Sequence, residues 1–208
     1  LRSWKNRLNG REAGQRRSTE ELQSNFNDIA DSWDSTNHCS AEKLQRIVEL
    51  SGIQGGSVLD LACGTGVLTE YLLKATPFVT GLDVAENMIA RAREKYAGTT
   101  ARFLRCNFYD FSGESFDAVI LHNAYPHFEN KERLVICLAG VLRPGGRLVV
   151  AHSMGRERLN RVHLGRPVGL STPLGPAARE AGLFKEAFDI DHIIDEKDFY
   201  AFSGVRRG

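Results

Sequence analysis

A short apolar run followed by closely spaced glycines is the stretch whose residue types best suit ligand binding. Val58–Leu61 contains one carboxylate, Asp60, and Gly64 and Gly66 follow before a helical pattern begins at Leu68. A strand that passes through a glycine loop into a helix directs free backbone N–H groups at a ligand. Asp60 would repel a pyrophosphate but attract an ammonium or sulfonium group. The loop therefore predicts a site for a cationic, amino-acid-like cofactor.

The spacing of these glycines argues against a dinucleotide. That pattern needs a third glycine three residues after Gly66, and Thr69 occupies the position. An acidic residue about 20 residues beyond the glycine loop, at the end of the next strand, is where folds of this type bind a ribose. Asp83 has that place, so we expect its carboxylate to accept hydrogen bonds from both ribose hydroxyls.

Four of the six histidines follow two later apolar runs, at 115–121 and 148–151; they are His122, His127, His152 and His163. Ligands of open α/β sheets bind beyond the carboxyl ends of the strands, so these side chains are expected to converge. A neutral imidazole can act as a general base, can bind Zn, Fe, Ni or Cu, or can simply shape a polar pocket. If one histidine is the base, His127 is our first choice, followed by His122 and His152.

Periodic patterns predict the elements that position these residues. Short apolar or alternating runs predict strands at 58–61, 78–83, 101–106, 115–121, 148–151, 184–190 and 199–205. Helical spacing predicts helices within 20–33, 41–50, 68–73, 84–96, 131–141 and 176–181. Strands alternating with helices indicate an α/β domain built on a mostly parallel sheet.

The sequence V-L-D-L-A-C-G-T-G at 58–66 resembles motif I of the class I S-adenosylmethionine-dependent methyltransferases, a strand followed by D-x-A/G-C-G-T-G. The resemblance continues to about Ala151 and includes the family's L-x-P-G-G turn at 142–146. It implies a doubly wound α/β fold with a seven-stranded sheet and an N-terminal helical cap. It also implies S-adenosylmethionine as cofactor and S-adenosylhomocysteine as product.

The same resemblance assigns most of the cofactor site. From motif I the residues implied are Asp60, Ala62, Cys63, Gly64, Thr65 and Gly66. Further along the chain they are Asp83, Val84, Met88, Asn107, Phe108 and His122, with Trp33 contributed by the cap. Asn107 stands where the family commonly has Asp, but an amide oxygen can still accept a hydrogen bond from adenine.

Length and composition bound the remaining possibilities. The 208 residues suit one domain at 21–208, preceded by a basic, flexible arm at 1–20. For the polar, Gly-rich segment at 153–172 the resemblance implies a substrate-lid insertion. The net charge is +1 and the pI about 7.9, which gives no general attraction to nucleic acid. Apolar runs fall short of a membrane span. The four separated cysteines predict reduced thiols and a cytoplasmic location.

The predicted activity is methyl transfer to a small-molecule acceptor whose reacting atom stays undetermined. The segment H-N-A-Y-P-H-F at 122–128 resembles the corresponding motif of small-molecule methyltransferases and differs from the N-P-P-Y of amino-nitrogen methylation in DNA. Arg156, Arg158 and Arg161 could hold a carboxylate or phosphate of the acceptor. Two alternatives remain, a non-catalytic sensor or partner subunit that binds S-adenosylmethionine, and a nucleic-acid methyltransferase that uses the basic arm.

Overall fold

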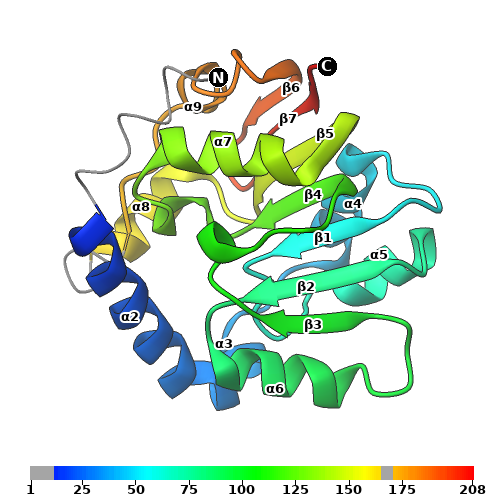
Figure 1. Ribbon diagram of the computed structural model, residues 1–208. Coiled ribbons are helices and arrows are strands. Elements are labelled where there is room, and N and C mark those ends of the chain that lie inside the picture. Colours follow the sequence, from blue (N-terminus) through cyan, green and yellow to red (C-terminus); the bar gives the residue numbers. More distant parts are fainter. Residues whose placement is uncertain (1–11, 165–170) are drawn as a thin grey trace.

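A seven-stranded sheet runs through the centre of the computed structural model, which describes residues 12–164 and 171–208 (Figure 1). The strands are β1 (Val58–Leu61), β2 (Val79–Asp83), β3 (Arg102–Arg105), β4 (Phe116–His122), β5 (Leu142–His152), β6 (Phe188–Asp195) and β7 (Tyr200–Arg206). Their order is β3-β2-β1-β4-β5-β7-β6. The first five are parallel, and β7 is antiparallel to both β5 and β6. The predicted fold class is confirmed.

Helices cover both faces of this sheet, which is why β1 and β2 are buried along their whole length (Figure 1). One core lies under α4 (Ala41–Ser51) and α5 (Thr69–Ala75). The larger core lies under α7 (Lys131–Val141) and α9 (Ala177–Gly182). The remaining helices are α2 (Glu12–Ile29), η1 (Ala30–Ser32), α3 (Trp33–Thr36), α6 (Glu86–Lys95), η2 (Phe108–Asp110), η3 (Tyr125–His127) and α8 (Arg156–Leu164).

The beginning of the chain differs from the prediction. Helix α2 runs from Glu12 to Ile29 without a break, so the boundary expected at residue 20 falls inside a helix. The first part of the predicted arm, residues 1–11, lies outside the described residues. In Figure 1, α2 stands across the carboxyl ends of the parallel strands, where a cap was expected.

Two elements near the end of the sheet also depart from expectation. The strand predicted at 184–190 begins four residues later, at Phe188, because Phe184 belongs to the turn after α9 and packs its ring into the core. The predicted L-x-P-G-G turn lies within β5, whose register with β4 is irregular there. Gly145 supplies the positive φ, +77°, that this irregularity requires. Among the described residues, no helix combines the length and apolar character of a membrane span.

Gly155 precedes α8 and packs against the turn between β6 and β7. A Cβ on Gly155 would lie 2.6 Å from the carbonyl oxygen of Glu196 and closer still to that of Lys197. Backbone atoms cannot rotate away, so Gly155→Ala should lower the free energy of unfolding by about 2 kcal/mol. Denaturant unfolding measures the loss. The matched control is Gly140→Ala, because nothing lies near its Cβ position and alanine favours a helix. Equal stability of the two variants would contradict the prediction.

Candidate functional site

A cavity of about 250 Å³ opens at the carboxyl ends of the parallel strands. Its walls come from α2 and α3, from the loops after β1, β2 and β3, and from the ends of β4 and β5 together with α8. Most residues predicted from the sequence line it: Trp33, Asp60, Ala62, Cys63, Gly64, Asp83, Val84, Met88, Asn107, Phe108, His122 and His127. The fold therefore brings the predicted cofactor residues and two of the three candidate bases into one space.

Asp83 fixes the glycine loop. Its Oδ2 accepts a hydrogen bond from the backbone N–H of Gly64, and its Oδ1 accepts one from Ala85, both at 2.9 Å. The loop itself takes left-handed backbone angles, with φ +58° at Ala62 and +54° at Gly64. One buried carboxylate thus sets the loop after β1 and begins the turn into α6 while lining the cavity. Burial raises the pKa of Asp83, and the backbone hydrogen bonds oppose that shift.

Thr65 and Gly66 do not line the cavity, and their role in cofactor binding stays a prediction. The Thr65 hydroxyl is buried and donates to Asp34 Oδ1. The Gly66 carbonyl accepts from the Tyr96 hydroxyl at 2.8 Å, and a Cβ on Gly66 would collide with Tyr96 and Thr69. The second half of the loop supports the first half, because its polar groups point into the protein.

Asp60 is the most unusual group in the cavity wall. It is 2% exposed, and its Oδ2 has no hydrogen-bond partner among the described residues. Burial and the neighbouring Asp83 raise the pKa of Asp60 to about 7. A buried carboxylate oxygen without a partner is costly, and a cationic ligand group would remove that cost. Asp60 therefore fits the cationic ligand expected from the sequence.

Asn107 has a structural task as well as a place in the cavity wall. Its Oδ1 accepts from the backbone N–H of Tyr109 at 3.1 Å and so caps η2. The amide oxygen that was expected to meet adenine is therefore already engaged once, although an amide oxygen has a second lone pair.

Of the four histidines predicted to converge, three line the cavity and one does not. His127, in η3, lies with its ring 5.4 Å from the Phe26 ring and 5.7 Å from that of His163. His122 is 7% exposed, and burial lowers its pKa to about 4. Because of this low pKa, the His122 imidazole is uncharged at neutral pH. His122, His127 and His163 all line the cavity.

His152 does not line the cavity, and its catalytic role stays a prediction. It is fully buried, with its ring 5.8 Å from the Tyr200 ring. Burial lowers the pKa of His152 well below its ordinary value, with a smaller effect from His122. Among the described residues, no group of three or more His, Cys, Asp or Glu side chains could hold a metal ion.

Two polar residues at the strand ends and the residue that fixes η3 were not predicted from the sequence. Asn123 and Ser153 follow the last residues of β4 and β5 and line the cavity. The rule that ligands bind beyond the strand ends would have found both. Lys131 Nζ donates to the carbonyl oxygens of Tyr125 and Phe128, each at 2.6 Å, and so fixes the turn that carries His127. Nothing in the sequence pattern indicated this role for Lys131.

The three arginines that were candidates for holding an anionic acceptor group do not line the cavity. Arg156 instead pairs with Asp195 of β6 at 3.2 Å. Two other residues of the predicted lid, Leu159 and Val162, form part of the cavity wall together with His163. Part of that segment, 165–170, lies outside the described residues.

Known proteins with similar sequences and structures agree on one family. Residues 59–150 match the family model described as a methyltransferase domain. An uncharacterised methyltransferase of Mycobacterium tuberculosis (strain ATCC 25618 / H37Rv) is 33% identical over 95 residues, 45% of this chain and 48% of the relative. The ubiquinone/menaquinone biosynthesis C-methyltransferase UbiE of Geobacter sulfurreducens is 29% identical over 156 residues, 67% of this chain and 61% of the relative.

A solved structure shares the fold. The N-methyltransferase NodS from Bradyrhizobium japonicum WM9, in complex with S-adenosyl-L-homocysteine, has a TM-score of 0.69 at 19% identity, over 92% of this chain and 99% of NodS. Residues 59–150 therefore resemble a methyltransferase domain in sequence, and the chain shares the fold of a solved methyltransferase. It spans 48% to 61% of the length of the two curated relatives, so the activity, substrates and partners of the whole protein are matters for proposal.

The cavity fits the cofactor that this methyltransferase family uses. Asp60 offers an unpaired carboxylate oxygen where a cationic group is needed, and Asp83 lies at the end of β2 where a ribose is expected. Glycine at position 64 leaves space in the cavity wall, because a Cβ there would lie 3.8 Å from Trp33 and 3.9 Å from Met88. An apolar wall that includes Met88 and Phe108 suits a flat ring such as adenine.

Proposed function

We propose that this chain transfers the methyl group of S-adenosylmethionine to a small-molecule acceptor. The observation that carries the proposal is that one cavity joins the glycine loop to the polar ends of β4 and β5. A cofactor held by Asp60, Gly64 and Asp83 would thus share its space with the histidines at the strand ends. UbiE is named a C-methyltransferase and NodS an N-methyltransferase, so they do not indicate one acceptor atom for this chain.

When bound, S-adenosylmethionine supplies an electrophilic methyl group on a sulfonium. The protein then has to hold an acceptor in line with that methyl group and exclude water. The aromatic side chains of Phe26, Trp33 and Phe128 form part of the cavity wall and would keep the reacting atoms dry. His127, on the turn fixed by Lys131, would accept a proton from an acceptor nucleophile that carries one.

Asp60 should make cofactor affinity depend on pH, because its pKa is raised to about 7 and a cationic ligand prefers the ionised form. If only that form binds, affinity should rise roughly eightfold from about pH 6 to about pH 7.5. The stability of the free protein should change with pH in the opposite direction to the cofactor affinity. A raised pKa in the folded state means that the contribution of Asp60 to stability is present at low pH and is lost between about pH 4 and pH 7.

Calorimetric titrations with S-adenosylmethionine across this pH range test the dependence on Asp60. Asp60→Asn cannot ionise, so its affinity should stay flat where the wild-type affinity rises. Parallel curves for the two proteins would show that another group titrates and would remove Asp60 from the site.

The proposed activity is tested by incubating the protein with methyl-labelled S-adenosylmethionine and a cell extract, then separating small molecules, proteins and nucleic acids. Label in the small-molecule fraction is the expected result. Label in nucleic acid would favour the alternative that uses the basic arm, whose first residues lie outside the described part of the chain. Cofactor binding without any transfer would favour the sensor or partner subunit.

The predicted cytoplasmic location stays a proposal, supported by four unpaired cysteines.

A further inference from the structure

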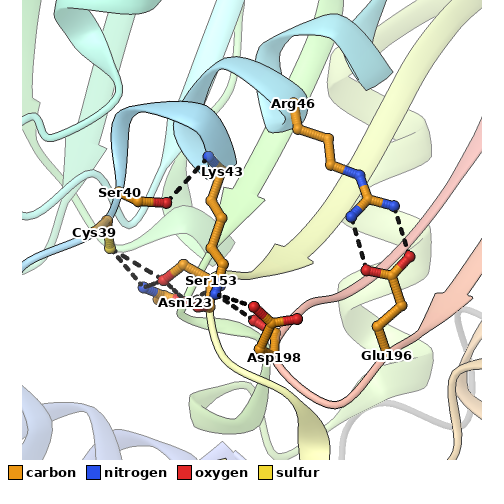
Figure 2. Close-up of polar contacts among 8 residues, drawn as sticks. All are labelled: Cys39, Ser40, Lys43, Arg46, Asn123, Ser153, Glu196 and Asp198. Carbon is orange, nitrogen blue, oxygen red and sulfur yellow. Dashed lines mark hydrogen bonds and ion pairs between the residues drawn. The ribbon is translucent and has the colours of Figure 1, made fainter.

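Three uncharged polar side chains meet at the wall of the cavity that faces α4 (Figure 2). Cys39 precedes α4, Asn123 follows β4 and Ser153 follows β5, and all three line the cavity. The Cys39 Sγ and Ser153 Oγ are 3.0 Å apart. Asn123 Nδ2 lies 3.0 Å from Ser153 Oγ and 3.8 Å from Cys39 Sγ. We call Cys39, Asn123 and Ser153 the strand-end cluster.

The backbone of Asn123 is shaped to place this amide. Asn123 has φ +55°, in the left-handed region that few residues other than glycine and asparagine adopt. This turn carries the side chain across to Ser153, whose backbone N–H donates to Asn123 Oδ1 at 3.0 Å. Because that N–H can only donate, the amide orientation is fixed, and Nδ2 must face the hydroxyl and the thiol.

The cluster has more donor hydrogens than good acceptors. Asn123 Oδ1 serves Ser153, through its N–H and, at 3.4 Å, its hydroxyl. The two amide hydrogens of Asn123 then have one close acceptor, Ser153 Oγ, because a sulfur at 3.8 Å accepts only weakly. The Cys39 thiol, 3.0 Å from Ser153 Oγ, can use the second lone pair of that oxygen, so one hydrogen of the Asn123 amide is left for a ligand. Such a group recognises an oxygen atom that accepts hydrogen bonds.

The charges around the cluster favour an uncharged oxygen. Lys43 is the cation beside it in Figure 2, and its ammonium group is taken up by the Asp198 carboxylate at 3.1 Å and by the carbonyl oxygens of Asp198 and Ser153. Farther along α4, Arg46 is paired with Glu196 through two hydrogen bonds of 2.8 Å. Carboxylates line the other end of the same cavity, at Asp34, Asp60 and Asp83, and would repel an anionic molecule.

Because of these two ion pairs, the strand-end cluster is not needed for a purely structural role. Lys43–Asp198 and Arg46–Glu196 already fasten α4 to the turn between β6 and β7 (Figure 2). Ser153 and Asn123 are therefore not required to hold α4 in place, and their side chains remain at the cavity surface. We propose that the strand-end cluster is the acceptor-recognition subsite and binds the carbonyl or hydroxyl oxygen of an uncharged, ring-bearing acceptor. The inference rests on the proposed methyl transfer.

The apolar part of the cavity wall is the reason why we expect the acceptor to contain a ring. Phe26, Phe128, Leu159 and Val162 line the cavity with His127 and His163. Flat aromatic and imidazole side chains of this kind pack well against a ring. An acceptor held by its oxygen at the cluster would place the ring among these side chains and beside His127, the candidate base.

The test uses 1-naphthol and 1-naphthoate as probes of equal ring size, one neutral and one anionic. Each is titrated by calorimetry into the full chain saturated with S-adenosylhomocysteine. We expect 1-naphthol to bind at least about tenfold more tightly than 1-naphthoate. The carboxylate of 1-naphthoate would be repelled by the carboxylates in the cavity wall, and the lysine beside the cluster is already paired. Asn123→Gly should weaken 1-naphthol binding about fivefold, the effect of one lost hydrogen bond. Ser153→Ala removes the hydroxyl that holds the Asn123 amide in place and should weaken binding in the same direction. Glycine is chosen at 123 because it tolerates the positive φ.

The control is Ser203→Ala, a serine of β7 that hydrogen-bonds Asp191 and does not line the cavity. Its affinity for 1-naphthol should equal that of the wild type. Equal or tighter binding of 1-naphthoate, unchanged binding by both cluster variants, or no binding of 1-naphthol at millimolar concentration would each overturn the inference. S-adenosylhomocysteine binding, measured on the same sample, distinguishes the two failures. Loss of S-adenosylhomocysteine binding would overturn the proposed function. S-adenosylhomocysteine binding without 1-naphthol binding would overturn the inference alone.

Discussion

His127→Ala should lower turnover by about 100- to 10,000-fold while leaving the affinity for S-adenosylmethionine unchanged, the range usual for a lost general base. The reason is its place: the ring lies in the cavity wall between Phe26 and His163, beyond the strand ends. The groups that would hold the cofactor lie in β1, in the loop after it and at the end of β2, at Asp60, Gly64 and Asp83, so they should not sense the change.

Steady-state kinetics with the acceptor found by labelling, together with calorimetry on the cofactor, measures both quantities. His192→Ala is the matched control, since His192 lies on β6, contacts Asp191 and Ser203 and does not line the cavity. A parallel fall in turnover and cofactor affinity would mean that His127 supports the fold of the pocket. Unchanged turnover would mean that the nucleophile carries no proton that His127 removes.

The comparison of His122 with His152 shows where sequence reasoning stops. Both end a strand, and both were expected at the acceptor. His122 pairs with Ala151 and opens to the cavity, but His152 pairs with Tyr200 of the antiparallel strand β7, which seals it. That pairing joins residues 48 positions apart, and apolar periodicity along one segment carries no information about it.

Local chemistry was predicted where one segment contains all the parts. The strand, glycine loop and helix of motif I are contiguous, so 58–66 was sufficient to place Asp60 and Gly64. The strand-end cluster and the Lys131 turn needed the fold, because each depends on atoms from several elements. The hydrogen bonds of Thr65 and Gly66 needed the fold for the same reason: their partners, Asp34 and Tyr96, lie outside the motif.

Asp83→Asn should weaken the binding of S-adenosylhomocysteine by about 3 kcal/mol, roughly 100-fold in Kd. Both carboxylate oxygens already accept backbone N–H groups, from Gly64 and Ala85. An amide has one oxygen, so its NH₂ group would face one of these donors and leave it unsatisfied. The ribose would at the same time lose a charged acceptor for its hydroxyls. The loop and the ligand therefore depend on the same two oxygen atoms.

A matched variant separates the loss of a ligand contact from the loss of stability. Asp117→Asn also removes a carboxylate that accepts a backbone N–H, that of Ser57 at 2.7 Å, and Asp117 does not line the cavity. Both variants should unfold at lower denaturant concentration, but only Asp83→Asn should lose affinity in calorimetry. Wild-type affinity in Asp83→Asn would show that the ribose lies elsewhere. Equal losses of affinity in both variants would show that binding merely follows stability, because Asp117 has no contact with the ligand.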